Sequence, residues 1–326
     1  MRIGIDCRLG GLAHAGIGRY CEQLVYHVVQ HDFDVPLEPQ NITWVLFFYN
    51  QKQIDDSTLF TQIVDNPQVE VRFTAVKHYT VAEQLFMPLY FYQARLDLLH
   101  VPHFNVPFLY FKDFVVTIHD LLWHHYQGTK VTTLPKALYW LKYLGYRFIS
   151  TQAIARAKQI FVPAHTVAKD LKRTCGVSDT QITVTYEGVD RSALVEQPSK
   201  AKLDTIDQSL LNKQYLLFVG SLYPHKNISV VLKALQQNKD LSLIIAGSRN
   251  VFQDKVKEEV VQLELSNRVH FVGFVPDSDL SLLYKKAVAL VQPSFSEGFG
   301  LTGIEAMAIG VPVLASDIAI FKELYG

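Results

Sequence analysis

The fold class of this chain is decided by the stretch Gln292-Pro-Ser-Phe-Ser-Glu-Gly-Phe-Gly-Leu-Thr-Gly-Ile-Glu-Ala-Met-Ala-Ile-Gly-Val-Pro-Val-Leu-Ala315. The apolar run Ala287–Val291 before it is typical of a buried parallel strand. The two glycines of Glu297–Gly300 predict a loop whose backbone can approach a ligand closely. A short helix is expected over Leu301–Ile309, ending at Gly310, and an apolar strand follows it. This alternation of strand and helix, repeated along the chain, predicts an α/β fold with parallel sheets.

Two carboxylates flank the predicted glycine loop. We expect Glu297 in the loop at a strand's carboxyl end and Glu305 on the helix that follows. The unpaired N–H groups at the start of that helix form a site for anions. Such a set suits a ligand with hydroxyls at both ends and phosphates in the middle, which is the shape of a nucleotide diphosphate sugar. The residues alone leave one alternative open, an ordinary strand–loop–helix turn with two solvated glutamates.

The same stretch closely resembles the Glu-x7-Glu signature of retaining glycosyltransferases of family 4. The resemblance implies that Glu297 contacts the donor sugar and that Glu305 contacts the ribose. It also implies that backbone amides hold the diphosphate and the sugar, and these amides belong to Gly298, Phe299, Gly300 and Leu301. The expected architecture is GT-B, with two doubly wound Rossmann-like α/β domains and the site in the cleft between them.

Length and composition are consistent with two soluble domains. The chain has 326 residues, of which 49% are hydrophobic and 19% charged, and single cores usually stop growing near ~250–300 residues. We predict an N-terminal acceptor-side domain over 1–191, a linker over 192–214 and a nucleotide-sugar-binding domain over 215–326. Lys plus Arg and Asp plus Glu both number 31, and the absence of a basic excess argues against a general nucleic-acid binder.

The cysteines and the apolar runs favour a cytoplasmic enzyme. Cys7, Cys21 and Cys175 are odd in number and widely spaced, which predicts neither a disulfide framework nor a metal site. We see no signal peptide, and no apolar run reaches the ~18 residues that a membrane span needs. The long helix expected over Leu134–Ala157 mixes aromatic and basic residues. Packing inside the domain is the favoured interpretation, and peripheral contact with the inner membrane face is the alternative.

Two positions of the first domain are candidate site residues. Gly16 opens a helix after the strand Arg2–Cys7, although the turn lacks the third glycine of a dinucleotide fingerprint and a plain turn is equally compatible. The family resemblance implies that Gly16 touches the donor. His119 follows the strand Phe114–Ile118, in a pattern that resembles the family's His-Asp turn. The resemblance places His119 beside the donor sugar, where it would bond a hydroxyl or donate near developing charge. A lone histidine is otherwise more often structural. The loop His124–Thr133 is expected to be flexible and to receive the acceptor.

The second domain supplies the remaining predicted donor contacts. Lys226 is expected to open a helix after the strand Tyr215–Val219 and to hold the diphosphate, as in the family's Pro-Arg/His-Lys-Asn turn. Asn227 belongs to the same turn. Ser221 stands where many members carry an arginine, so a second cationic contact is missing or is replaced by His225. Val275 lies in the turn that frames the nucleobase through its backbone.

These resemblances imply metal-independent, retaining transfer of a hexose to a hydroxyl of a glycan or a lipid-linked glycan, without a cofactor. Similarity to mannosyltransferases at Pro224–Asn227 and Ile118–Leu121 favours GDP-mannose as donor. Members usually continue beyond the equivalent of Gly326, so the C-terminal part is expected to be incomplete. The alternative from another class is a non-catalytic GT-B scaffold that binds sugar nucleotides. A phosphorylase of related fold is also conceivable, but no motif for a pyridoxal phosphate lysine is visible.

Overall fold

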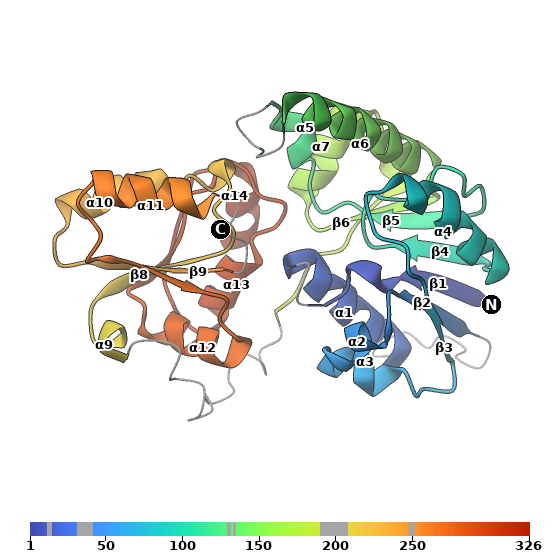
Figure 1. The fold of residues 1–326 in the computed structure, drawn as a ribbon, viewed down its shortest axis with the longest axis horizontal. Coiled ribbons are helices and arrows are strands. Elements are labelled where there is room, and N and C mark those ends of the chain that lie inside the picture. Colours follow the sequence, from blue (N-terminus) through green and yellow to red (C-terminus); the bar gives the residue numbers. More distant parts are fainter. Residues whose placement is uncertain (12–14, 31–41, 129–131, 133–134, 190–207, 248–251) are drawn as a thin grey trace. The chain divides into compact units, whose positions relative to one another are not determined.

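The computed structural model describes residues 1–11, 15–30, 42–128, 132, 135–189, 208–247 and 252–326. They form two compact units, each with its own parallel sheet (Figure 1). The first unit comprises Met1–Leu121 and Ala137–Tyr186, and the second comprises Leu122–Lys136 and Glu187–Gly326. Residues 122–136 therefore group with the second unit, although the sequence analysis assigned them to the first domain. The predicted linker lies mostly outside the described residues, and its end forms the helical turn α9 (Gln208–Leu211).

The first unit contains a seven-stranded parallel sheet in the order β3-β2-β1-β4-β5-β6-β7. Its strands are β1 (Arg2–Asp6), β2 (Thr43–Phe48), β3 (Val69–Phe73), β4 (Leu98–Val101), β5 (Phe114–Thr117), β6 (Gln159–Val162) and β7 (Ile182–Val184). The order reverses between β1 and β4. In doubly wound sheets, ligands bind outside the carboxyl ends of the strands at such a reversal.

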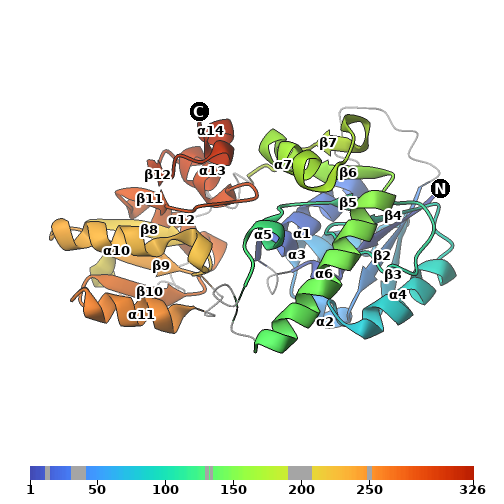
Figure 2. The same cartoon turned by 90° about the horizontal axis from the view of Figure 1, so that it is seen from above.

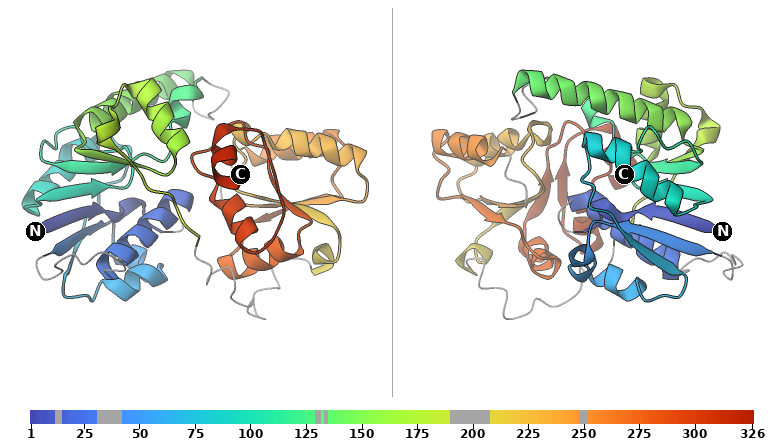
Figure 3. Two further views of the ribbon diagram at one scale, coloured as in Figure 1. Left: turned by 180° about the vertical axis from the view of Figure 1, so that it is seen from behind. Right: turned by 45° about the vertical axis from the view of Figure 1, so that its right-hand side comes forward.

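Helices cover both faces of this sheet. One face carries α1 (Ala15–Gln30), α2 (Gln51–Asp55) and α3 (Thr58–Ile63), and the other carries α4 (Val81–Gln93), α6 (Lys136–Arg156) and α7 (His165–Cys175), as Figure 1 and Figure 3 show. Crossovers between parallel strands are right-handed, so the change of direction after β3 moves the connecting helices to the opposite face. The inner strands β2 and β5 are buried on both sides, which explains their continuous apolar runs, whereas the edge strands β3 and β7 are only partly buried.

The second unit contains a five-stranded parallel sheet in the order β10-β9-β8-β11-β12. Its strands are β8 (Tyr215–Val219), β9 (Ser242–Ala246), β10 (Val269–Gly273), β11 (Ala289–Gln292) and β12 (Val313–Ala315). The helices are α10 (Ile228–Gln237), α11 (Gln253–Gln262), α12 (Asp277–Lys286), α13 (Leu301–Ala308) and α14 (Ala319–Tyr325).

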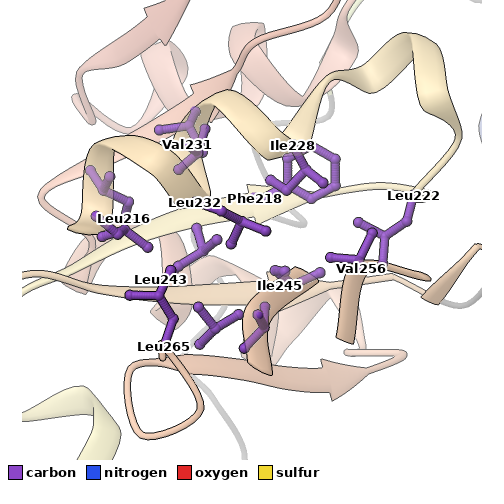
Figure 4. Packing of buried hydrophobic residues seen from close by; sticks show 14 of the residues in the cluster. Leu216, Phe218, Leu222, Ile228, Val231, Leu232, Leu243, Ile245, Val256 and Leu265 are labelled. Atoms are coloured by element: carbon purple, nitrogen blue, oxygen red, sulfur yellow. The ribbon is translucent and has the colours of Figure 1, made fainter. Parts of the chain in front are cut away.

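Successive residues of β8 point to two different cores of the second unit. Leu216 and Phe218 pack with residues of α10 and α11 in the cluster shown in Figure 4. Tyr215 and Leu217 belong to the cluster on the other face, with residues of α12 and α13. Because strand side chains alternate, a strand buried on both faces must be apolar throughout. The continuous run over Tyr215–Val219 meets this requirement.

Most predicted elements agree with the structure to within a few residues. The strands over Val69–Phe73 and Tyr215–Val219 have the predicted bounds. The predicted strand Arg2–Cys7 ends one residue early, because a 3₁₀ turn over Cys7–Leu9 begins there. The predicted N-cap of α12 at residue 277 or 278 was wrong, since Pro276 occupies the cap position.

Four helical elements have no counterpart among the elements predicted from the sequence: α2, α3, α14 and the turn α5 (Leu122–His125). The predicted acceptor loop over 124–133 overlaps the end of α5, and its residues 129–131 and 133 lie outside the described residues. None of the described helices is both long and apolar enough to cross a bilayer.

Candidate functional site

At the carboxyl edge of the second sheet, the main chains that leave neighbouring strands pack closely against one another. Gly220, Gly247 and Gly273 stand at the ends of β8, β9 and β10, and Gly220 and Gly273 have positive φ angles of 143° and 70°. The amide of Gly247 donates to the Gly273 carbonyl at 2.8 Å. A Cβ on Gly247 would collide with the Gly220 carbonyl oxygen. Glycine is therefore required here, and the edge exposes main chain where ligands of open α/β sheets bind.

Lys226 and Glu297 form the central ion pair of this edge. The Lys226 Nζ donates to both carboxylate oxygens of Glu297 at 2.6 Å. Ser294 Oγ donates to Glu297 Oε1 at 2.7 Å, so the carboxylate is held from two sides. The side chains are 21% and 11% exposed. Two residues predicted separately as ligand contacts are thus brought together across 71 positions of sequence.

The local structure around Lys226 differs from the prediction. Lys226 ends a 3₁₀ turn over Pro224–Lys226 instead of opening α10, and Asn227 follows in the left-handed region with φ of 53°. The Phe295 amide donates to the His225 carbonyl at 2.8 Å and ties this turn to the Glu297 loop. The turn therefore aims Lys226 at the loop, while Asn227 starts the helix.

Burial, with a further contribution from Lys226, lowers the pKa of His225 to about 4. His225 is consequently neutral at pH 7 and does not replace the second cation expected near Ser221. Ser221 follows Gly220 directly at the sheet edge and is partly buried. An ammonium has three N–H donors, so Lys226 can hold a carboxylate and a phosphate oxygen together.

Glu305 is a buried carboxylate on α13. It is only 4% exposed, and the Tyr284 hydroxyl of α12 donates to its Oε2 at 3.0 Å. The alternative of two solvated glutamates is therefore wrong, because neither carboxylate faces open solvent. The sequence offered no signal for Tyr284, which lies 21 positions away and on another helix.

The start of α13 places main-chain donors beside this ion pair. Gly300 is the N-cap, with φ of 105°, and no side chain caps the first amides of the helix, which begins at Leu301. Phe299 is buried and anchors the loop that also contains Gly298. Val275, on the turn after β10, packs into the core, so only its backbone remains suited to frame a ligand.

Tyr325 of α14 holds the glycine loop in place through its hydroxyl. Its hydroxyl lies 2.6 Å from Gln292 Oε1 and 2.8 Å from the Gly300 carbonyl oxygen. Gln292 Nε2 in turn donates to Thr302 Oγ1 at 2.7 Å. Burial raises the pKa of Tyr325, which keeps the hydroxyl protonated as a donor. This contact was not identified from the sequence.

Gly303 lies where these side chains converge, and replacing it by alanine should disturb them. Its Cβ would collide with the Tyr325 hydroxyl and with Gln292 Oε1. We expect Gly303→Ala to destabilise the second unit by about 1–3 kcal/mol, as overpacking does. The control is Gly145→Ala, also in a helix but with open space around its Cβ. Higher helix propensity should make that control neutral or stabilising by up to ~1 kcal/mol. Thermal unfolding measures both, and equal effects would contradict the packing argument.

The first unit carries the other two predicted site residues at the carboxyl edge of its own sheet. Gly16 has open space where a Cβ would stand, so local packing does not require glycine there. A Cβ on Gly18, by contrast, would collide with the Gly11 carbonyl oxygen. Gly18 is thus the residue that the turn needs, and a role for Gly16 stays a prediction.

His119 is held in a defined orientation after β5. Its Nε2 lies 3.1 Å from the Pro102 carbonyl oxygen, and its ring packs edge-on against Tyr20 at 4.7 Å. A carbonyl can only accept, so Nε2 carries the proton and, in the neutral ring, Nδ1 is an acceptor. The contact with Pro102 therefore fixes the tautomer of the neutral ring, and a place beside a donor sugar stays a prediction.

A buried charge cluster near the end of β1 was also missed. Arg8 is 1% exposed, and its guanidinium binds both oxygens of Asp6 at 2.8 and 2.6 Å and Glu83 at 2.8 Å. Glu83 Oε2 accepts from the amide of Tyr79 at 2.7 Å and from the side-chain amide of Asn105. Tyr79 has a positive φ of 57°. The cluster pins the loops after β1, β3 and β4 at one edge of the sheet.

No group of three or more side chains suited to hold a metal ion gathers among the residues that the structure describes. Metal independence stays a prediction.

Comparisons with known families match both parts of the chain. The model described as "Glycosyltransferase Family 4" matches residues 15–193, and the model described as "Glycosyl transferases group 1" matches residues 201–326. The O-antigen chain mannosyltransferase RfbU of Salmonella typhimurium is 29% identical over 263 residues, which are 80% of this chain and 68% of that protein. The O-antigen chain mannosyltransferase B of Escherichia coli is 38% identical over 117 residues, only 34% of this chain and 31% of its own.

Solved structures confirm the predicted fold class, two doubly wound α/β domains of the GT-B type. Sucrose-phosphate synthase from Thermosynechococcus elongatus has a TM-score of 0.70 at 18% identity, over 99% of this chain and 82% of its own. Anabaena HepE in complex with UDP and glucose has a TM-score of 0.67 at 20% identity, over 99% of this chain and 83% of its own.

Proposed function

Because this chain belongs to glycosyltransferase family 4, we propose that it is a retaining hexosyltransferase that moves mannose from GDP-mannose to a hydroxyl of a glycan or of a lipid-linked glycan. The observation that carries the proposal is Glu297, held by Lys226 and Ser294 beside the uncapped start of α13. Mannose is supported by the relatives named as O-antigen chain mannosyltransferases. The UDP-glucose complex of HepE makes that donor the main competitor to test.

In this proposal the second unit binds the donor mainly through main chain. The diphosphate lies against the first amides of α13 and against Lys226, whose charge stabilises the leaving group. Glu297 accepts hydrogen bonds from the sugar hydroxyls, and the buried Glu305 does so from the ribose. The backbone at Val275 frames the base. This proposal needs no metal, because the Lys226 ammonium and the first amides of α13 offset the negative charge of the diphosphate.

Retention in this proposal follows from attack on the same face that the phosphate leaves. The phosphate oxygen takes the proton of the acceptor hydroxyl as the new glycosidic bond forms and the sugar–phosphate bond breaks. No side chain then acts as a covalent nucleophile. In this proposal His119 contributes a hydrogen bond to a hydroxyl of the donor sugar.

Removing the Lys226 ammonium should weaken donor binding. Hydrogen bonds to charged groups contribute ~1.5–3 kcal/mol, so Lys226→Ala should raise the KM for the donor roughly tenfold to a hundredfold. The control is Lys233→Ala, an exposed lysine of α10, which should leave KM unchanged. Steady-state kinetics with varied donor measures both. An unaltered KM in Lys226→Ala would exclude the proposed diphosphate contact.

The proposal is tested with a panel of GDP- and UDP-sugars against free and lipid-linked glycan acceptors, with products read by mass spectrometry. A mannosylated product from GDP-mannose is the expected result. The alternative, a non-catalytic scaffold, predicts thermal stabilisation by a sugar nucleotide without product or free nucleoside diphosphate. Release of nucleoside diphosphate from another donor would replace mannose while keeping the reaction class.

The proposed compartment is the cytoplasm. The three cysteines of the chain are free in the structure, and free thiols fit a reducing environment.

A further inference from the structure

The imidazole of His225 contacts two tyrosine rings within the second unit. Tyr223 stacks on it, with 5.8 Å between the ring centres and 17° between the planes. Tyr126 approaches the same imidazole at 5.8 Å, with the planes tilted by 42°. Residues 122–136 group with the second unit, so both contacts lie inside it. The second contact had no signal in the sequence, because Tyr126 precedes every strand of the second sheet.

Tyr223 anchors the imidazole to the core of the second unit. It packs against the buried cluster of Figure 4, and its ring lies 5.4 Å from that of Phe252, which is only 4% exposed. The Tyr223 carbonyl accepts from the Lys226 amide at 2.9 Å. The imidazole therefore has a fixed support on this side, and the turn that ends at Lys226 closes on the same residue.

Tyr126 is held at the end of the turn α5. Its amide donates to the Leu122 carbonyl at 2.8 Å, and Gln127 Nε2 donates to the His124 carbonyl at 2.9 Å. Figure 2 shows α5 as a short turn ahead of the long helix α6. Burial raises the pKa of Tyr126, so its ring is neutral at pH 7 and covers the imidazole without adding charge.

The main chain of His225 connects these rings to the donor residues. Its carbonyl accepts from the Phe295 amide at 2.8 Å, in the loop that contains Glu297, and Lys226 is the next residue. The Lys226 Nζ lies 2.6 Å from both carboxylate oxygens of Glu297. A shift of this turn by about 1 Å would lengthen both contacts beyond hydrogen-bonding distance.

The covered imidazole also keeps a second positive charge away from the ion pair. Burial is the main cause of the low pKa of His225, about 4, while Lys226 lowers it further and Glu297 raises it. The two tyrosine rings contribute to that burial by covering the imidazole. The neutral ring leaves the Glu297 carboxylate to Lys226, since an imidazolium would compete for it.

We propose that Tyr126 is a positioning residue of the donor site, which acts through the His225 ring to hold the turn Pro224–Lys226 against the Glu297 loop. The inference deepens the proposed function and rests on it for the role of Lys226. It gives the end of α5, where the sequence predicted an acceptor loop, a part in donor binding.

Proton NMR of the histidine rings in the full chain tests the contact. The His225 signal is identified by its absence in His225→Ala. In Tyr126→Ala water should reach the imidazole, and its pKa should rise from about 4 towards the ordinary value of 6.5. Tyr126→Phe keeps an aromatic ring and should leave that pKa near 4. An unchanged His225 pKa in Tyr126→Ala, with folding verified by circular dichroism, would overturn the proposal.

Calorimetric titration with GDP and with UDP tests the positioning. Tyr126→Ala should weaken binding of the preferred nucleotide about threefold to tenfold, the contribution of one aromatic contact. Tyr126→Phe should stay within about twofold of the wild type. The control is Tyr186→Ala in the first unit, where Tyr186 is 54% exposed and its ring lies 5.9 Å from that of His165. This control should bind the nucleotide as the wild type does.

The double variant Tyr126→Ala with His225→Ala tests whether Tyr126 acts through His225. It should bind the nucleotide no more weakly than His225→Ala alone, because coupled contacts are not additive. Additive losses would overturn the proposal. Normal nucleotide binding by folded Tyr126→Ala would contradict this inference alone, whereas a wild type that binds neither GDP nor UDP would contradict the proposed function and this inference with it.

Discussion

Glu297→Ala is expected to lower kcat by about a thousandfold while the second unit stays folded. The carboxylate is fixed by Lys226 at 2.6 Å and by Ser294 at 2.7 Å, so in the proposed reaction it would meet the donor sugar without reorganising. Losing one preoriented electrostatic contact typically costs ~10²–10³ in kcat. The second unit should stay folded, because the Lys226 side chain is 21% exposed and water can solvate its ammonium once the carboxylate is removed. Single-turnover kinetics and thermal unfolding measure the two effects.

Two variants separate the role of Glu297 from a general effect of charge. Glu258→Ala removes an exposed glutamate of α11 and should leave kcat unchanged. Glu297→Gln retains acceptor and donor atoms but not the charge, and should fall between the alanine variant and the wild type. Wild-type-like transfer by folded Glu297→Ala would refute the assignment of this carboxylate to the donor sugar.

Arg8→Met is expected to be the most destabilising substitution in the first unit. It would leave Asp6 and Glu83 buried with no guanidinium between them. Breaking a buried ion pair by removing one partner costs about 3–5 kcal/mol, because the remaining charge stays desolvated. Urea unfolding, followed through the transition of the first unit, measures the loss.

The matched control for this prediction is Arg72→Met. Arg72 pairs with Glu70 at 2.6 Å in the same unit, but both side chains are about one-third exposed, so the expected change is below about 1 kcal/mol. Acid provides a second readout. Burial alone would raise the pKa of Asp6, but the Arg8 guanidinium outweighs it and holds that pKa below its ordinary value of 3.8. The stabilisation by ionised Asp6 is therefore present above pH 3.8 and is lost as the pH falls through the lower folded pKa. Equal stability of the two methionine variants would contradict the argument.

Local patterns were sufficient to predict most of the fold. Continuous apolar runs such as Tyr215–Val219 identify strands buried on both faces, because every side chain there must be apolar. Glycine and proline near Gly310 marked the end of α13 to within a residue or two, since Gly310 has φ of 79° just after the helix. Short helices such as α2 and α3 escaped, because five or six residues hold too little periodicity.

The candidate site could be predicted only in part. The positions of the glycines and glutamates after the predicted strands indicated where a ligand site is expected. The residues that hold these glutamates and glycines could not be predicted. Nothing in the sequence marks Tyr284, Ser294 or Tyr325 as their neighbours, because folding alone brings them together. The neutral state of His225 likewise depends on burial, which no spacing of residues reports.

The amino-acid sequence by itself determined two parallel-sheet domains, the positions of Glu297 and Glu305 around a glycine loop, and the family signature that they carry. Only the tertiary structure decided that Lys226 holds Glu297, that Glu305 is buried, and that Arg8 closes a charge cluster with Glu83 across 75 positions. The physical reason is range: periodicity and turn chemistry act between near neighbours, whereas desolvation and ion pairing depend on which distant segments the folded chain brings within a few ångströms.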